Sequence, residues 1–298
     1  MQDKRSAFTL LELSIMLAVL SAVLVIIAST GYLFKASQLS SARALTNQSP
    51  VNFTDGVVLW LDATSNASFD NNENIDGSEV SIWKNIYSKN SNNFYVSESS
   101  NKPNFVRYAI NDLPAIEFDG VNDILTSNNN TYLSAKTNFN IFIVFEADTN
   151  NSEINGRIFA WGSGSDGNNL ITFRIGTLGK DYLAANISDG SVKYIQTANI
   201  INNKIPYIAS LVFDGFGATD SDKYRLFLNG AQQTITTHGS SFSSITASGN
   251  YPFYLGTEYG AYSAGKIAEI IVINKAISDQ RKDEIEKYLS KKWGIKLE

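Results

Sequence analysis

Cysteine is absent from the 298-residue chain, and histidine occurs once, as His238. The lack of cysteine excludes disulfides, thiolate metal sites and cysteine nucleophiles. It leaves the redox compartment open, because a domain of this size can hold together without bridges. A single imidazole in a polar loop is typical of a solvated side chain, since metal sites usually use more than one. The chain also has no block of lysine and arginine and a net charge of −5, which argues against nucleic acid as a partner.

The first long apolar run lies close to the N-terminus. Residues 13–34 contain no charged side chain, and 22 helical residues at about 1.5 Å each span roughly 33 Å, enough to cross a bilayer core. Lys4 and Arg5 precede the run, so the positive-inside rule places the short leader in the cytoplasm and the rest of the chain outside. The run is too long for an ordinary secretory signal, and no A-x-A-type cleavage site follows Ile27.

Glu12 is an acid at the start of this apolar run. An acid in such a position is costly and by default marks a functional residue with a partner to be named. Phe8 lies four residues earlier, on the same helix face. If the chain is cut between Ala7 and Phe8, the new α-amine lies where Glu12 of the same or a neighbouring subunit could pair with it. The plain alternative is a signal anchor in which Glu12 lies near the interface, where its cost is small.

The charged leader ending in Ala7, followed by FTLLE and an unbroken apolar helix, resembles the N-terminus of type IV prepilins and type II secretion pseudopilins. The resemblance covers about the first 45 residues. It implies cleavage after Ala7 by a prepilin peptidase, methylation of the Phe8 amine, and a role for Glu12 in the assembly of neighbouring pilin subunits. The family most often has Gly before the cut, where this chain has Ala7.

The domain organisation follows from these patterns. We expect a leader at 1–7, a transmembrane and assembly helix with its stalk at 8–47, a linker at 48–52, and a β domain at 53–298. Pro50 disfavours a helical residue before it, so the helix is predicted to end at Asn47-Gln48-Ser49.

From residue 53 the sequence consists of short apolar runs, spaced about ten residues apart and separated by Gly, Asn and Asp, which is typical of an all-β sandwich. NIFIVFEA and AEIIVIN are apolar at nearly consecutive positions, which predicts strands buried on both faces. Asn229-Gly230 within YRLFLNGAQQTI predicts a hairpin turn.

The last segment of the chain predicts an amphipathic helix. Ser278 is the expected N-cap, Ile285, Leu289 and Trp293 form an apolar stripe, and Gly294 marks the end. We expect this stripe to pack on the sandwich and the charged face to contact solvent.

The ordered set WLDA, AIEFDGVNDIL, SLVFDG, YRLFLNG, YLG and GKIAEIIVINKAIS resembles the concanavalin A-like, laminin-G-like superfamily of bacterial surface proteins. The resemblance covers nearly all of residues 53–298 and implies a lectin-like jelly-roll sandwich.

Two candidate sites lie in its predicted loops. Asp119, Asn122 and Asp123 beside Gly120 offer the oxygen ligands that Ca²⁺ prefers, and the alternative is a β-turn whose side chains bond their own backbone. Tyr259 and Tyr262 are candidate ligand-contacting aromatics at the rim of the sandwich, and the alternative is that both cover the edge of the core.

No catalytic residue is predicted. Glu73, Asp76 and Glu79 are three apart, whereas laminarinase-type hydrolases on the resembled fold use a Glu-x-Asp-x-x-Glu strand that aims the acids at one cleft. We therefore expect a protein that is not an enzyme and that needs no cofactor, apart from the candidate Ca²⁺.

The sequence-based hypothesis is a minor pilin or pseudopilin that displays a lectin-like sandwich for adhesion or for binding a glycan or glycoprotein. Its precursor would cross the inner membrane once, and the mature form would lie in an extracellular pilus, at the cell surface or in a periplasmic pseudopilus. The alternative is a membrane-anchored surface protein that binds or hydrolyses glycans and does not assemble.

Overall fold

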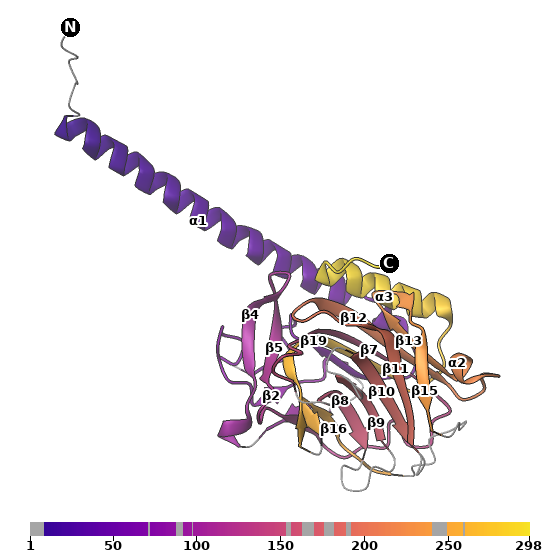
Figure 1. Cartoon of the computed structure of the whole chain (residues 1–298). Coiled ribbons are helices and arrows are strands. Elements are labelled where there is room, and N and C mark those ends of the chain that lie inside the picture. The colour runs from indigo at the N-terminus through magenta and orange to yellow at the C-terminus, as the bar shows by residue number, and fades with distance from the viewer. Residues whose placement is uncertain are drawn as a thin grey trace.

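The computed structural model describes residues 9–70, 72–87, 92–96, 98–152, 156–162, 170–175, 182–188, 192–239, 249–258 and 260–298. Helix α1 projects from a β-sandwich, which we call the head, and helix α3 lies beside the point where α1 meets the head (Figure 1). The predicted fold class, a long N-terminal helix followed by an all-β sandwich and a C-terminal helix, is confirmed.

Helix α1 runs from Leu10 to Asn47, 38 residues, so at 1.5 Å per residue it is about 57 Å long. It continues through Gly31 without a break and ends three residues before Pro50, as predicted. A short 3₁₀ helix, η1 (Pro50–Phe53), follows, and the Ser49 hydroxyl accepts a hydrogen bond from the Val51 amide at 3.2 Å.

Residues 48–52, predicted as a linker, pack against the head through two of their side chains. Ser49 and Val51 are buried, and the Asn52 side-chain amide donates to the carbonyl of Thr46 at 3.1 Å. The turn made by η1 places the Val51 side chain in an apolar cluster with α3, so the end of α1 is fixed to the head.

The first sheet has eight strands, seven of which form one hydrogen-bonded path. Strand β1 (Val57–Asp62) pairs antiparallel with β19 outside that path. The path runs β14 (Ala231–Gln232), β13 (Tyr224–Leu228), β12 (Pro206–Asp214), β7 (Asn138–Ala147), β19 (Ala264–Ile273), β5 (Leu113–Asp119) and β4 (Asn104–Ile110).

The second sheet has nine strands. Their order is β15 (Ile235–His238), β11 (Val192–Ile200), β10 (Tyr182–Ser188), β9 (Leu170–Ile175), β8 (Arg157–Gly162), β16 (Phe253–Leu255), β6 (Leu125–Ser127), β3 (Phe94–Tyr95) and β2 (Ile82–Trp83). A separate hairpin joins β17 (Thr257–Glu258) to β18 (Ala261–Tyr262). Besides η1, the described residues include the short helices η2 (Ser99–Asn101) and α2 (Asp220–Lys223).

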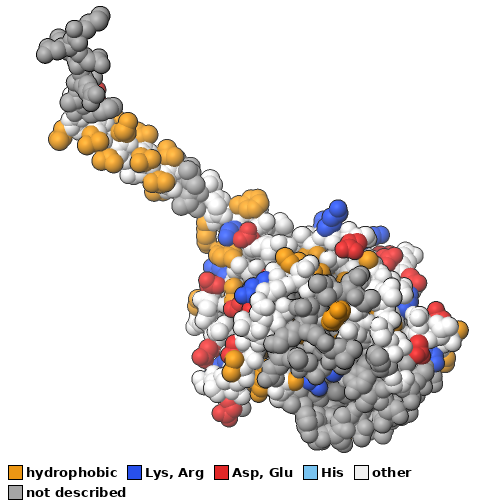
Figure 2. All heavy atoms as spheres, viewed as in Figure 1, with side chains coloured by type: hydrophobic (Ala, Val, Ile, Leu, Met, Phe, Trp, Pro, Cys, Tyr) orange, Lys and Arg blue, Asp and Glu red, His pale blue; other side chains and the backbone are white. Residues whose placement is uncertain are grey.

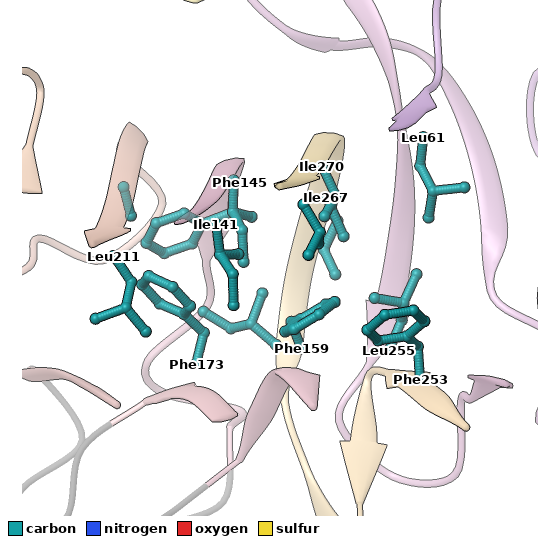
Figure 3. Close-up of a cluster of buried hydrophobic side chains, with 14 of the residues drawn as sticks. Leu61, Ile141, Phe145, Phe159, Phe173, Leu211, Phe253, Leu255, Ile267 and Ile270 are labelled. Carbon is teal, nitrogen blue, oxygen red and sulfur yellow. The ribbon is translucent and has the colours of Figure 1, made fainter. Parts of the chain in front are cut away.

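The two sheets enclose an apolar core (Figure 3). Aromatic rings fill much of it: Phe159 and Phe94 both lie against Phe253, with ring centroids 5.5 and 6.2 Å away. Ile141 and Phe145 of β7 point into this core from the first sheet. Burial of so much apolar area stabilises the sandwich without disulfides.

A second apolar cluster covers the outer face of the first sheet. Phe142 and Val144 of β7 alternate with Ile141 and Phe145 and belong to this second cluster. The prediction that NIFIVFEA is buried on both faces is therefore confirmed, since the sandwich core lies on one side and the helices lie on the other.

Helix α3 (Asp279–Trp293) supplies most of the cover for that outer face. Ser278 caps it by accepting from the Arg281 amide at 3.1 Å, and Gly294 ends it with a φ of +65°. Ile285, Leu289 and Trp293 are all buried, which confirms the predicted stripe. The hairpin at Asn229-Gly230 is also confirmed, with φ of +48° and +82° joining β13 to β14.

Candidate functional site

The outer part of α1 exposes a continuous apolar surface. Its most hydrophobic 18-residue window has a mean hydropathy of 2.7, and none of that window is buried. Figure 2 shows the apolar side chains along the projecting helix, away from the mixed polar surface of the head. By length and composition this helix can cross a membrane, and an apolar surface of this extent marks a site for lipid or for another protein. The large exposed side chains include Leu10, Leu11, Leu13, Ile15, Met16, Leu17, Val19, Leu20, Val23, Leu24 and Val25.

Glu12 is the single charged side chain in residues 9–34, and it caps the start of α1. Its Oε2 accepts hydrogen bonds from the Thr9 amide at 2.9 Å and from the Thr9 hydroxyl at 2.8 Å, while the Thr9 hydroxyl accepts from the Glu12 amide at 3.2 Å. This reciprocal capping box satisfies two amides at the helix terminus. Ala7 and Phe8 lie outside the described residues, so their predicted roles stay predictions.

The inner end of α1 is docked on the head. Ala42 is buried in the cluster that also contains Trp293 of α3, and Lys35 pairs with Asp112 at 2.8 Å. The Lys35 ammonium also lies 4.2 Å from the centre of the Tyr108 ring. A pocket of about 410 Å³ lies between α1 and the C-terminal end of α3, bordered by Phe34, Gln38, Lys291 and Gly294, among others.

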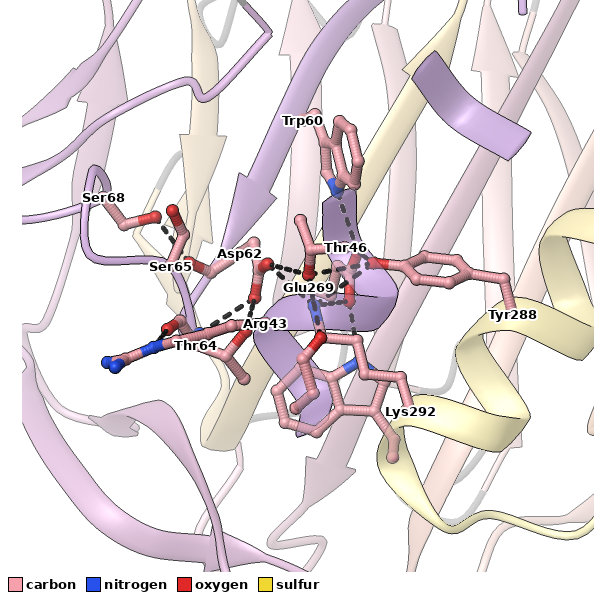
Figure 4. Close-up of polar contacts among 12 residues, drawn as sticks. Arg43, Thr46, Trp60, Asp62, Thr64, Ser65, Ser68, Glu269, Tyr288 and Lys292 are labelled. Carbon is pink, nitrogen blue, oxygen red and sulfur yellow. Dashed lines mark hydrogen bonds and ion pairs between the residues drawn. The ribbon is translucent and has the colours of Figure 1, made fainter. Parts of the chain in front are cut away.

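A cluster of polar side chains is buried where α1, β1, β19 and α3 meet (Figure 4). At its centre, the Lys292 Nζ lies 2.7 Å from Asp62 Oδ2 and 2.8 Å from Glu269 Oε2, and all three side chains are completely buried. The same Nζ lies 2.8 Å from the Thr46 hydroxyl and 3.2 Å from the Tyr288 hydroxyl. We call the seven residues of this cluster the buried polar cluster: Thr46, Trp60, Asp62, Glu269, Tyr288, Lys292 and Trp293.

The oxygens of both carboxylates in the buried polar cluster are held by further donors. Glu269 Oε1 accepts from the Trp60 indole and the Tyr288 hydroxyl, both at 2.7 Å, and Oε2 accepts from the Trp293 indole at 2.7 Å. Buried charge is tolerated only when it is paired and hydrogen-bonded in this way.

The Asp62 carboxylate also accepts hydrogen bonds at both of its oxygens. Its Oδ1 accepts from the amide and the hydroxyl of Thr64 at 2.8 and 2.7 Å, and its Oδ2 accepts from the Thr46 hydroxyl at 2.8 Å. The cluster contains two carboxyl groups and one amine. Burial raises the pKa of the Glu269 carboxyl, with the Lys292 ammonium acting in the opposite direction. Burial, followed by the charges of Glu269 and Asp62, also raises the pKa of the Tyr288 hydroxyl well above its usual value.

Sequence reasoning did not find the buried polar cluster, although its signal was present. Asp62 and Glu269 are acids inside strands that are otherwise apolar, and Lys292 lies beside the buried stripe of α3. Such positions call for a buried partner. The segments WLDA, KIAEI and KKW are far apart in the sequence, and only the fold brings them together.

The candidate Ca²⁺ residues form a turn after β5. Asp119 Oδ1 accepts from the amides of Val121 and Asn122 at 2.8 and 3.2 Å, and Asp123 Oδ2 accepts from the Asp119 amide at 2.8 Å. These bonds match the turn interpretation. Burial raises the pKa of the Asp123 carboxyl to about 6, while its hydrogen bond from Asp119 lowers it. Within the residues that the structure describes, no group of three or more His, Cys, Asp or Glu side chains is placed to hold a metal.

The candidate rim aromatics are only partly described. Tyr262 lies in β18, half-buried, opposite Thr257 of β17, and Tyr259 lies outside the described residues.

The three acids compared with the hydrolase pattern each contact a different residue. Glu73 accepts from the Ser81 amide at 3.0 Å, Asp76 accepts from the Arg107 amide at 2.8 Å, and Glu79 lies 3.6 Å from the Lys102 ammonium. Each acid therefore has its own partner.

No protein-family model matches the sequence. No curated protein matches it either. Among solved structures, the binding domain of Paraclostridial Mosquitocidal Protein 1 is similar, with a TM-score of 0.52 and 14% identity over 80% of this chain and 52% of that one. This chain therefore spans about half the length of that structure. At this identity the likeness concerns the fold alone, and it confirms a β-sandwich shared with a binding domain.

Two further structures are similar at lower scores. Domain 4 of AbnA, a GH43 extracellular arabinanase from Geobacillus stearothermophilus in complex with arabinotriose, has a TM-score of 0.43 and 14% identity over 61% of this chain and 81% of that one. The CBM40 of Ruminococcus gnavus IT-sialidase bound to α2,3-sialyllactose has a TM-score of 0.40 and 16% identity over 53% of this chain and 84% of that one.

Proposed function

We propose that this protein is a type IV pilin-like subunit, a minor pilin or a pseudopilin, that displays a lectin-like sandwich at the cell surface. The observation that carries the proposal is the exposed apolar part of α1, in which Glu12 is the single charged side chain. A helix of this kind needs lipid in the precursor and neighbouring helices in the mature form.

The position of Glu12 supports the proposed processing. Cleavage after Ala7 makes Phe8 the first residue, directly before Thr9. A carboxylate has about four acceptor sites, and the two bonds from Thr9 to Oε2 leave capacity for a chain-terminal amine. In this proposal the new amine of Phe8, from the same or an adjacent subunit, pairs with Glu12 and sets the register of the helices.

The head is proposed to bind a glycan, a glycoprotein or an adjacent subunit, and not to act as an enzyme. Support comes from the fold shared with a binding domain and from the separate partners of Glu73, Asp76 and Glu79. Repetition of weak sites along a fibre raises the overall avidity without new contacts. An array of glycans probed with the full chain in detergent tests this part, and a blank array would favour a purely structural head.

The proposed processing is tested by determining the N-terminal residue of the protein purified from its native host. Mass spectrometry should find a mature chain that starts at N-methyl-Phe8. A mature chain that retains Lys4 and Arg5 would contradict the proposal and favour the second candidate, a membrane-anchored binding protein that does not assemble. The observation that favours this candidate is Ala7, where the resembled family most often has Gly.

Substitution of Glu12 tests its role in assembly. Glu12→Gln keeps the shape of the side chain and removes the charge, so we expect at least a tenfold loss of the subunit from sheared filaments or cross-linked assemblies. Ser14→Ala is the matched control, because the Ser14 hydroxyl bonds only within its own helix, to the Leu11 carbonyl at 2.8 Å. Equal incorporation of the Glu12→Gln variant and the wild type would contradict the proposed pairing.

A further inference from the structure

We propose that Lys292 and Asp62 become covalently joined by an amide bond between Lys292 Nζ and Asp62 Cγ, formed inside the folded head with Glu269 as the catalytic group that takes up a proton and returns it. The bond would join β1, at the start of the head, to α3, at the end of the chain. It is independent of the proposed pilin function.

The reacting groups are already in contact. Lys292 Nζ lies 2.7 Å from Asp62 Oδ2, which is one bond from Cγ, and both side chains have no exposed area. Groups held at roughly 3 Å in one geometry react far faster than the same groups free in solution. The rings of Tyr288 and Trp293 have their centres 5.6 and 5.2 Å from Lys292 Nζ, so these rings and the complete burial of the pair keep bulk water from the reacting atoms.

Lys292 Nζ has more oxygen neighbours than an ion pair requires. Four oxygens lie within 3.2 Å of Nζ, one more than the three N–H donors of an ammonium. The cluster has two carboxyl groups for one amine, so each of the two protons that the amine must lose has an acceptor in contact with Nζ. Burial raises the pKa of the Glu269 carboxyl, which favours its uptake of one of these protons. A neutral amine has the lone pair that an ammonium lacks.

The balanced step is a condensation. Nζ first gives one proton to Asp62 Oδ2, directly across their contact, and this leaves a neutral amine beside a neutral carboxylic acid. The amine lone pair then attacks Cγ, and Glu269 Oε2, 2.8 Å from Nζ, takes a second proton. Glu269 returns that proton to Oδ2, the C–Oδ2 bond breaks with its electron pair, and one water leaves. No oxidant or other reactant is required.

The negative charge that develops during the attack falls on Asp62 Oδ1. The Thr64 amide and hydroxyl already donate to this atom at 2.8 and 2.7 Å, in the manner of an oxyanion hole. After condensation one N–H remains on the new amide and faces Glu269. Glu269 also keeps the donors from Trp60, Tyr288 and Trp293, so the product leaves its carboxylate fully hydrogen-bonded.

A second buried lysine on the same helix provides an internal control. Lys282 pairs with Glu286 at 2.8 Å, and the Ser210 hydroxyl donates to Glu286. The other carboxylate beside Lys282, that of Asp283, is half exposed to solvent. Lys282 therefore has no second buried acid to move protons, and we expect it to stay a free amine.

The mass of the purified full chain tests the proposal. We expect the wild type to be lighter than its processed sequence by one water. After complete tryptic digestion, the fragment 44–84, which contains Asp62, should be joined to fragment 292–296 through Lys292, and Lys282 should be cleaved normally. A wild-type chain at full sequence mass, without the joined fragment, would overturn the proposal.

Three variants sharpen the result. Lys292→Arg and Glu269→Gln should each abolish the loss of water, the first by removing the nucleophile and the second by removing the proton acceptor. Asp62→Asn should release ammonia instead and reach the same final mass as the joined wild type. Loss of water that persists in Lys292→Arg or Glu269→Gln would assign the modification to other residues and overturn the mechanism. The wild-type mass decides the question even if a variant does not fold.

Discussion

Lys292 is the residue on which the junction between helix and head depends. Its ammonium is fully buried between Asp62 and Glu269 and also contacts Thr46 of α1. A buried pair of this kind is weak evidence for stability in itself, because desolvation offsets much of the attraction. Removal of one partner is costly, because it leaves charge buried without compensation.

Lys292→Met should therefore reduce the free energy of unfolding by at least about 3–5 kcal/mol, since Asp62 and Glu269 would both lose their partner and the proposed bond to Asp62 could not form. Denaturant unfolding of the full chain in detergent measures the effect. Arg281→Ala is the control, because its pair with Glu284 is on the surface and should contribute about 1 kcal/mol or less. Equal effects of the two substitutions would contradict this account of the junction.

Asp123 should make the stability depend on pH in acid. Burial raises the pKa of its carboxyl to about 6 in the folded chain, above the ordinary value of 3.8. The folded state then binds this proton more tightly than the unfolded state. The stabilising contribution of the Asp123 proton is therefore complete below about pH 4 and is lost as the pH rises through about 6. Asp123→Asn should remove this dependence and stabilise the chain at pH 7.5 by about 1 kcal/mol, after allowance for solvent screening.

The measurement is the thermal unfolding midpoint of the wild type and of Asp123→Asn at pH 4.5 and pH 7.5. The difference between the two midpoints at each pH cancels the effect of the other titrating groups. The turn interpretation adds an expectation: Ca²⁺ or a chelator should leave both midpoints unchanged. A midpoint that rises with Ca²⁺ in the wild type and not in Asp123→Asn would support the cation site instead.

Single residues could be predicted from the sequence where the signal is local. The cap at Ser278, the end at Gly294 and the turn at Asn229-Gly230 all follow from neighbouring residues. The Thr9–Glu12 capping box also has a local signature, a Thr followed three residues later by a Glu. The partners of Lys292 were not readable, because Thr46 lies 246 positions away in the sequence.

Helix α3 covers the outer face of the first sheet. Strands β7 and β19 are buried on both faces over most of their length, so the sheet depends on α3, η1 and the end of α1 for the cover of its outer face. Periodicity in the sequence could predict that these strands are buried twice and that α3 has an apolar stripe. It could not predict the strand order, because pairs such as β1 with β19 depend on long-range contacts.

Leu289→Ala should leave a cavity between α3 and the sheet and reduce the free energy of unfolding by about 2–5 kcal/mol. Leu289 is 1% exposed, so nearly all of its side chain is lost from packed surroundings. Lys287→Ala, on the exposed face of the same helix, is the control and should change the stability by less than about 0.5 kcal/mol. Similar destabilisation by both would contradict burial as the source of the effect, and helix propensity could not explain it, because alanine is a better helix former than either residue.

The whole molecule has two parts with different surfaces. The head has a mixed polar surface, whereas the outer part of α1 has apolar side chains on all of its described faces. The sequence predicted this division, because hydropathy and length suffice for it. The docking of α1 on the head was not predicted, since residues 39–47 give only a weak apolar stripe.

Leu20→Arg should move the full chain from the membrane fraction to the alkali-extractable fraction. Leu20 lies near the middle of the exposed segment, where an arginine costs about 3 kcal/mol on the scale of membrane insertion. Ser40→Arg, on the docked end of α1, should leave the distribution unchanged. Complete retention of Leu20→Arg in the membrane would argue that another segment anchors the chain.

The position of the buried polar cluster determines how the protein carries tension. A pull on α1 enters the head at Thr46, and Thr46 meets Lys292 of α3 directly. The force therefore reaches the first and last elements of the head together. In a subunit that is anchored through α1 and gripped by its sandwich, this junction is loaded first, and the proposed bond between Lys292 and Asp62 would keep β1 and α3 from separating under that load.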